Sequence, residues 1–361
     1  MLQRTRREFV GMSLAAPLAA IGLSVASRFS FAAELSGTTL RIATWGGSWR
    51  DSINKNVVSD LISSGVNVEY VLGNPEDNLA KLIAASRQGQ VPFDAMEGFP
   101  HITNPMAKAG LIEKLNYDNL PNTKAAPKWA RSEYEVVSVF TEDGVVYNVD
   151  KFKEAGIEPP THYTDLTNPK LKGRVAFPDI GNAQHWNAVV GLAYESGGDE
   201  AHMDGAVKLV NEISPSYFFS ASTELATRFG SGDIWAAPWH AGWASRLKRS
   251  GVPVSVGYTS FGDRRAAIWQ VPDYVVTNSP NVAAAEAFIN DLLAPENQFE
   301  HGRATGTIPV ISQARIKLKD DPISKELLLL DDADLENIFQ IDWNKLDEKA
   351  WRETWSREIH R

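Results

Sequence analysis

The feature that most constrains the fold is a repeated alternation of short apolar strand patterns and amphipathic helix patterns. TLRIATW (39–45), VNVEYVL (66–72) and FDAMEG (93–98) predict three strands, and an amphipathic stretch follows each of the first two. A new strand about every 25 residues is typical of a doubly wound α/β sheet with parallel strands. The helix after the first strand is expected to bury one stripe of side chains: Ile53, Val57, Leu61 and Ile62.

Two long extended runs interrupt this alternation, at residues 134–150 and 266–278. Between them lies a second set of strand and helix patterns, so the runs are interpreted as crossings between two lobes. The predicted fold class is therefore α/β, with two lobes, each a mixed sheet flanked by helices, joined by two hinge crossovers. The predicted division is residues 33–141 for the first lobe, 142–269 for the second, and 270–361 for a return to the first lobe with C-terminal helices.

The first 32 residues have the composition of a bacterial export leader. A basic start is followed by an apolar stretch from Val10 to Ala26 and by small residues at Ser30 and Ala32. The pair Arg6–Arg7 resembles a twin-arginine signal. Residues 1–32 are therefore expected to be removed, which leaves the mature protein in the periplasm; a retained membrane span is the weaker alternative, because Pro17 breaks a short stretch.

Charge and cysteine content exclude several classes of function. The net charge of −9 argues against nucleic acid as a partner, and the leader contains more basic than acidic residues, so the mature part is more acidic still. The chain has no cysteine, which excludes disulfides and thiolate metal sites. No HExxH, P-loop or GxSxG pattern is present. No catalytic residue, metal or cofactor is expected, although a secreted enzyme with an unrecognised site stays open.

Several of the 11 tryptophans fall at predicted strand ends, where ligands bind in open α/β sheets. Aromatic rings offer a large rigid area to a small solute and can hold a cation. The candidates for the cleft lining are Trp45, Trp49, Trp186, Trp239 and Trp269. Gly47 is expected to allow a tight turn after the first strand, with Ser48 and Asp51 forming a capping box.

Acidic residues near the same strand ends are candidates for holding an amine. They are Glu97, Glu142, Asp179, Glu224 and Asp273. Each alone is equally compatible with a solvated surface, so the residue types alone leave the contacts open.

Five stretches together resemble a known family. They are LRIATWGGSW, GVVYNVDKFKEAGIEPPTHYTDLTNPKLKGRVAFPD, FGSGDIWAAPWHAGWA, AIWQVPDYVVTNSPNVAAAEAFINDLLAPENQ and GTIPV. In this order they look like the periplasmic spermidine/putrescine-binding proteins of ABC transporters, over nearly all of the chain. The resemblance implies a type II periplasmic-binding fold, a small organic solute, a membrane permease as partner, and a monomer.

The resemblance also implies individual site residues. Trp45, Trp239 and Trp269 match aromatic residues that sandwich the polyamine in that family. Val271 stands where the pattern has an amine-binding aspartate, Phe99 replaces a polar residue after the third strand, and Asp179 half matches an acidic pair. A polyamine-like or related amine-containing solute is therefore expected. A carboxylated or phosphonate solute, such as an opine or an aminophosphonate, is the alternative, and a receptor that serves chemotaxis alone is a third possibility.

Overall fold

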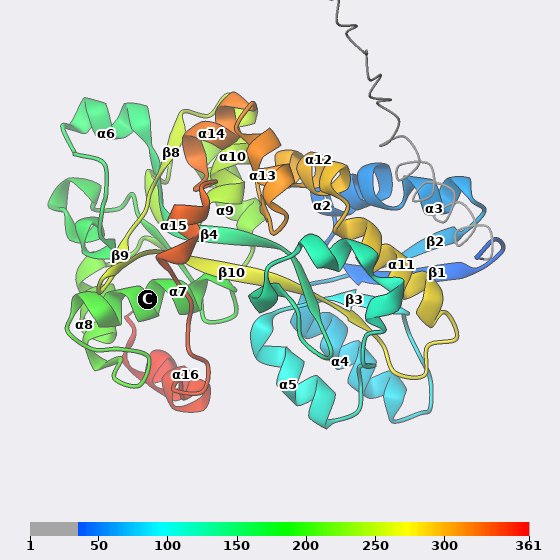
Figure 1. Cartoon of the computed structure of the whole chain (residues 1–361). Coiled ribbons are helices and arrows are strands. Elements are labelled where there is room, and N and C mark those ends of the chain that lie inside the picture. Colours follow the sequence, from blue (N-terminus) through cyan, green and yellow to red (C-terminus); the bar gives the residue numbers. More distant parts are fainter. Residues whose placement is uncertain (1–34, 361) are drawn as a thin grey trace, which may run out of the picture.

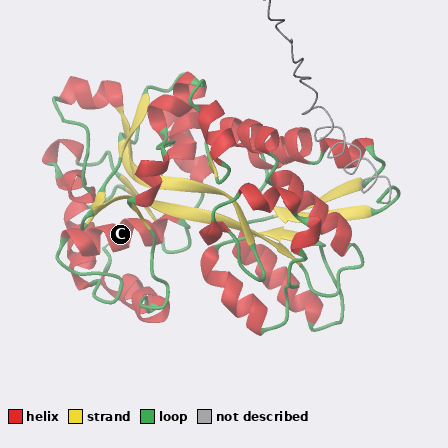
Figure 2. Ribbon diagram, in the orientation of Figure 1, coloured by secondary structure: helices red, strands yellow, loops and turns green. Residues whose placement is uncertain are grey.

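The structure is a computed structural model that describes residues 35–360. The expected leader and its twin-arginine pair lie outside the described residues. Two groups of elements stand side by side and are joined by two long strands, β4 (Val136–Asn148) and β10 (Arg264–Val275) (Figure 1). Helices lie on both sides of the strands that run through the middle of the molecule (Figure 2). The predicted two-lobed α/β fold with two crossings is confirmed.

The first lobe is built on a three-stranded parallel unit. β1 (Thr39–Thr44) pairs in parallel with β2 (Asn67–Leu72) and with β3 (Ala95–Glu97). Its helices are α2 (Ser48–Ser52), η1 (Ile53–Val57), α3 (Ser59–Ser63), α4 (Pro75–Ser86) and α5 (Pro100–Lys108), with short turns η2 (Tyr117–Asn119), η3 (Pro121–Ala125) and η4 (Lys128–Ala130).

The single helix expected after β1 is broken in the structure. α2 leads into a π-helical turn, η1, before α3 begins. A π-turn holds more residues than an α-turn, so side chains beyond it no longer follow a 3.6-residue stripe. Ile53, Val57 and Leu61 are buried as predicted, whereas Val58 takes the next inward position and Ile62 is 42% exposed.

The second lobe contains a two-stranded parallel sheet and strands that extend the crossing strands. β5 (Ala176–Pro178) pairs with β6 (Tyr217–Phe219), while β7 (Ala236–His240) and β8 (Val254–Gly257) pair antiparallel with β4, and β9 (Ser260–Phe261) pairs with β10. Its helices are α6 (Val149–Ala155), η5 (Tyr163–Thr167), η6 (Pro169–Leu171), α7 (Gln184–Glu195), α8 (Asp204–Ile213), α9 (Ser222–Ser231) and α10 (Ala241–Arg249).

The crossing strands join both lobes into one sheet, which has ten strands among the described residues. In it β11 (Ile308–Pro309), β4, β10, β3, β1 and β2 are neighbours in that order. β10 runs antiparallel to β3 and to β4, so the sheet is mixed rather than purely parallel. At the middle of the crossing, Trp269 of β10 lies opposite Thr141 of β4.

After β10 the chain first returns to the first lobe and then leaves it. α11 (Val282–Leu292) and α12 (Pro295–Thr305) pack on β1 and α2. The remaining elements are β11 (Ile308–Pro309), α13 (Ser312–Leu318), α14 (Pro322–Leu327), α15 (Asp332–Glu336), β12 (Ile338–Phe339) and α16 (Glu348–Glu358).

The last helix does not follow the expected return to the first lobe. Trp351 Nε1 donates a hydrogen bond to His185 Nε2 at 2.7 Å, and Trp355 Nε1 donates one to Asp179 Oδ1 at 3.2 Å. Both acceptors belong to the second lobe, where the C-terminus also lies (Figure 1). Two buried tryptophans fix this position, because each buries its ring and also finds an acceptor for its N–H, as buried indoles usually do. The expectation that all of residues 270–361 return to the first lobe is therefore wrong for α16.

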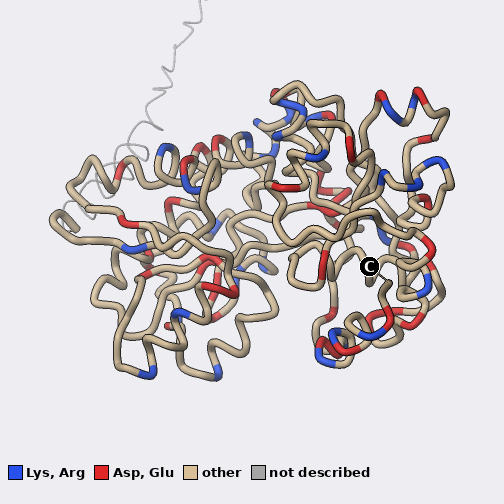
Figure 3. Tube along the Cα trace, turned by 180° about the vertical axis from the view of Figure 1, so that it is seen from behind, with Lys and Arg blue, Asp and Glu red and all other residues tan. Residues whose placement is uncertain are grey.

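Within the part of the chain that the structure describes, no helix has both the length and the apolar character needed to cross a membrane. Figure 3 shows acidic and basic residues interspersed along this part of the chain.

Candidate ligand-binding site

A cavity of about 500 Å³ lies between the lobes. Its walls come from the connections that follow strands β1, β2, β3, β5, β6 and β7, and from β4 and β10 at the crossing. The residues that line it are Trp45, Gly46, Gly47, Trp49, Asn74, Glu76, Phe99, Thr141, Gly181, Asn182, Ala183, Gln184, Ser220, Ala221, Ser222, Thr223, His240, Trp243, Arg246, Trp269 and Val271. A volume of this size fits a small organic molecule.

Aromatic rings from three separate segments form one side of the cavity. Trp45 follows β1, Phe99 follows β3, and Trp269 lies in β10. The ring centroids of Trp45 and Phe99 are 5.8 Å apart, and those of Phe99 and Trp269 are 4.9 Å apart in an edge-to-face arrangement. We call these three residues the aromatic wall.

The turn after β1 places Trp45 at the cavity. Gly47 has φ 63° and ψ −142° and precedes α2, a backbone conformation that is essentially restricted to glycine. No side chain caps α2, and Ser48 is its first residue. The expected capping box of Ser48 and Asp51 is therefore absent, and the glycine alone makes the turn.

Trp49 is held from behind by a buried carboxylate. Its Nε1 donates to Glu97 Oε2 at 2.9 Å, and the Thr44 hydroxyl donates to the same oxygen. Glu97 is 1% exposed, and burial raises the pKa of its carboxyl to about 7. Trp49 lines the cavity, packed edge-to-face on Trp45, whereas Glu97 supports the wall and does not reach the cavity.

Residues 62–326 match the model of a family described as bacterial extracellular solute-binding protein. The chain belongs to this family. Its members bind solutes and are not enzymes, which agrees with the expectation that the chain is no enzyme. No curated protein matches this solute-binding protein.

Solved structures share the fold of this solute-binding protein at low identity. The protein AgtB from A. tumefaciens R10, solved with agropinic acid, is 20% identical with a TM-score of 0.66, over 89% of this chain and 96% of that one. The Atu4243–GABA receptor is 21% identical with a TM-score of 0.72, over 90% and 99%. A candidate spermidine/putrescine ABC transporter from Listeria monocytogenes is 19% identical with a TM-score of 0.70, over 89% and 97%.

The cavity brings together five of the expected contacts: Trp45, Gly47, Trp49, Phe99 and Trp269. Val271 lines the same cavity, at the position where the resemblance implies an aspartate.

Trp239 does not line the cavity of this solute-binding protein, contrary to expectation. It is fully buried and stacks on Trp243, with ring centroids 5.3 Å apart and planes 15° apart. Trp243, one helical turn later, is the residue that reaches the cavity. The sequence contained a hint, because the two tryptophans lie close together at the end of β7 and the start of α10, but only the geometry of this junction decides which ring faces the cavity.

The expected acidic contacts also lie outside the cavity lining. Glu142 is buried, accepts hydrogen bonds from Tyr258 Oη at 2.7 Å and from the Leu329 amide at 3.0 Å, and burial raises the pKa of its carboxyl to about 8. Asp179 accepts from the indole of Trp355, as described above. Both carboxylates therefore serve the packing of the C-terminal segment.

The three remaining expected contacts do not line the cavity either. Asp273 is completely buried beside Glu97, its partner across β10 and β3. Burial and the Glu97 charge raise the pKa of Asp273. Glu224 lies on the outer side of α9 and pairs with Arg228 at 3.6 Å. Trp186 is buried between His185 and Trp343.

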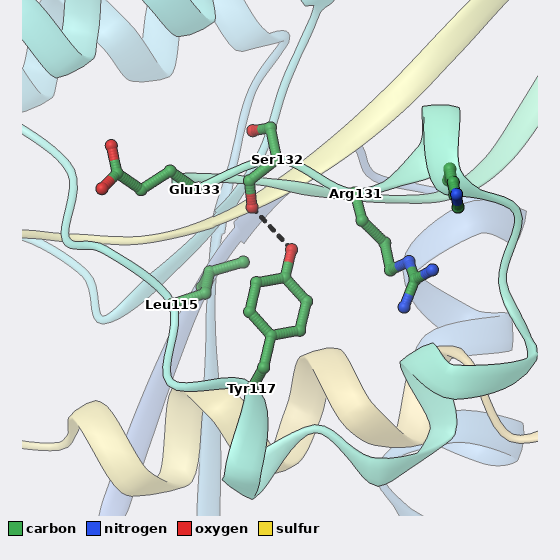
Figure 4. A pocket seen from close by; sticks show the side chains of 6 residues that line it. Leu115, Tyr117, Arg131, Ser132 and Glu133 are labelled. Atoms are coloured by element: carbon green, nitrogen blue, oxygen red, sulfur yellow. Dashed lines mark hydrogen bonds between the residues drawn. The ribbon is translucent and has the colours of Figure 1, made fainter.

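A second hollow, on the first lobe, lacks these features. Figure 4 shows Tyr117 between Leu115 and Arg131, with its hydroxyl donating to the Ser132 carbonyl at 2.6 Å. Only one aromatic residue lines it, and Glu133 pairs with Lys114 at 2.5 Å. With a single aromatic ring and a position away from the junction of the lobes, it is a weaker candidate than the inter-lobe cavity.

Proposed function

We propose that this protein is the periplasmic receptor of an ABC importer and captures a small amine-containing organic solute between its lobes. The observation that carries the proposal is the aromatic wall. Three rings from the first lobe and the crossing strand line one cavity of solute size, at the junction of two lobes. Neighbouring aromatic rings can hold an alkyl chain and a cationic amine at the same time.

The proposed mechanism is closure of the lobes around the solute rather than chemistry. The hinge lies in β4 and β10 near Thr141 and Trp269, so we place the lobe boundaries at residues 141/142 and 269/270. The closed form is then presented by a monomer to a membrane permease. The proteins named above for a polyamine, an opine and GABA support a solute of this size and character.

A thermal-shift screen of the leaderless protein tests the proposal. A bound solute stabilises the folded protein by mass action, by about 2.7 kcal/mol in the free energy of unfolding at a solute concentration of 100 times Kd, and so raises the melting temperature. We expect a shift with at least one small amine among polyamines, amino acids, opines and aminophosphonates. The absence of any saturable shift across these classes contradicts the proposal, and turnover of a bound compound argues for a secreted enzyme instead.

A further inference from the structure

The charges in the cavity wall are few and are separated. Of the lining residues, two carry a charge at neutral pH: Glu76, in the first turn of α4, and Arg246, on α10. His240 also lines the cavity, but burial and the nearby Arg246 hold its pKa well below the usual value, so it is neutral. The wall therefore offers one anion from the first lobe and one cation from the second.

Arg246 is a cation without an anionic partner. Its Nε donates to the Thr305 carbonyl at 3.0 Å, and its guanidinium lies 4.5 Å from the centroid of the Trp243 ring. Among the described residues it forms no ion pair with a carboxylate. Burial lowers its pKa to about 10, which leaves it protonated at neutral pH. A partly desolvated charge of this kind is costly unless an anion pairs with it.

The surroundings of Arg246 also suit an anion. The start of α9 lines the same cavity through Ser222 and Thr223, and no side chain caps this ten-residue helix. Free amides at a helix start, with the positive end of its dipole, favour negative charge. The rest of this side of the cavity is made of small or amide-bearing residues, among them Asn182 and Gln184, and of Trp243.

Glu76 reaches the cavity from the first lobe, in the first turn of α4. Its carboxylate is 4.0 Å from His101 Nε2, but burial lowers the pKa of His101 to about 4, so this imidazole is neutral and does not pair with the carboxylate as a cation. Arg246 lies on α10 of the second lobe. The two charges therefore enter one cavity from opposite lobes.

We propose that the captured solute is a zwitterion, whose acid group, a carboxylate or a phosphonate, is held by Arg246 and the start of α9. Its amine then lies at the aromatic wall, towards Glu76. The inference rests on the proposed function and adds to it the second charge of the solute and its orientation. The proposal also explains why Val271 can stand in the place of an amine-binding aspartate, since the amine then lies towards Glu76 instead.

Matched solutes test the proposal on the unmodified protein. Putrescine, 4-aminobutanoate and 3-aminopropylphosphonate share a short chain and one amine, and differ in the second group; agmatine and arginine form a longer pair that differs by one carboxylate. We expect calorimetry to show that the acid-bearing member of at least one set binds about 10- to 100-fold more tightly than its diamine or decarboxylated counterpart. Equal or tighter binding of the member without an acid group, in every set that binds, overturns the proposal.

Variants then test whether Arg246 is the residue that holds the acid group of the solute. Arg246→Gln should remove this preference, and Arg246→Lys should restore part of it. Arg228→Gln, which removes the same charge from the outer side of α9, is the matched control and should leave the preference unchanged. An acid preference that survives in Arg246→Gln overturns the assignment.

If no member of the sets binds, simple anions decide. Titration with acetate and with methylphosphonate should change the tryptophan fluorescence of the unmodified protein and of Arg228→Gln, because Trp243 contacts the guanidinium, and should not change that of Arg246→Gln. Identical titrations in all three proteins overturn the proposal. Failure of the proposed function gives a different result. If binding depends on Arg246 but is unaffected by Trp45→Ala and Trp269→Ala, the aromatic wall is not part of the binding site, whereas the anion subsite is.

Discussion

The indole N–H of Trp49 is hydrogen-bonded to the carboxylate of Glu97, a residue that water does not reach. This bond joins α2 to the end of β3 and sets the ring against which Trp45 packs edge-to-face. A buried acid thus fixes the geometry of a wall that the solute would touch. The electrostatics of the support and the shape of the cavity are therefore linked.

Glu97 should make the stability of the protein depend on pH. Its pKa is about 7 in the folded chain and about 4.3 in an unfolded one. The folded state therefore binds the proton more tightly, so this contribution to stability is complete below about pH 4.3 and is lost as the pH rises through 7. Glu97→Gln keeps an oxygen acceptor for Trp49 but does not titrate. We expect its melting temperature to fall less between pH 5 and pH 8 than that of the unmodified protein. The exposed variant Glu224→Gln serves as control and should follow the unmodified protein; an equal fall in Glu97→Gln means that Glu97 is already ionised at pH 5.

Removal of the Trp45 ring should weaken the binding of the solute. Trp45→Ala should cost about 1 kcal/mol or more in binding free energy, because the ring supplies a stacking face, and calorimetry with the solute found by the thermal-shift screen measures this cost. Trp129→Ala is the matched control, since that ring is 45% exposed and does not line the inter-lobe cavity. Equal affinities of the two variants would place Trp45 outside the contact surface.

The turn at Gly47 should not tolerate a side chain. Gly47→Ala meets no neighbouring atom within 4 Å, but it must adopt a positive φ, which costs about 1 to 3 kcal/mol. Gly46→Ala is the control, because its added carbon makes only an ordinary contact, 3.6 Å from Leu72. Urea denaturation should show the loss in Gly47→Ala alone, and equal midpoints would mean that the turn relaxes.

The C-terminal helix should contribute strongly to stability. Trp355 is 2% exposed and its ring centroid lies 4.4 Å from that of His185. Trp355→Ala should cost about 3 to 5 kcal/mol in the free energy of unfolding, because it leaves a cavity in the place of a buried ring. Chemical denaturation measures the loss against Trp129→Ala. A loss below about 1 kcal/mol would show that α16 is only loosely attached.

The fold could be predicted from the sequence because its elements are governed by local periodicity. β1, β2 and β3 alternate with helices, and the two long extended runs became β4 and β10. The π-turn at Ile53–Val57 and the position of α16 could not be predicted in this way. The first depends on how one turn packs, and the second on hydrogen bonds from Trp351 and Trp355 to distant partners.

The site was predictable where position along a strand decides it. Trp45, Phe99 and Trp269 reach the cavity because they follow or lie within strands that end there. Carboxylates were harder to place, since Glu142 and Asp273 satisfy every sequence criterion for a cleft residue and are nevertheless buried beneath it. Arg246 was missed because it lies inside a helix, where only the direction of α10 turns it towards the cavity.

The pairing of Trp269 with Thr141 in the crossing strands has a mechanical consequence. Because β4 and β10 pair with each other along the crossing, with one irregularity between Val271 and Pro272, the lobes are not joined by loose loops. Any closure therefore has to twist β4 and β10 themselves. The same twist reorients Trp269, which is part of the wall. Sensing a solute and moving the lobes would then be one motion of a single strand, so a change that stiffens β10 should alter both together.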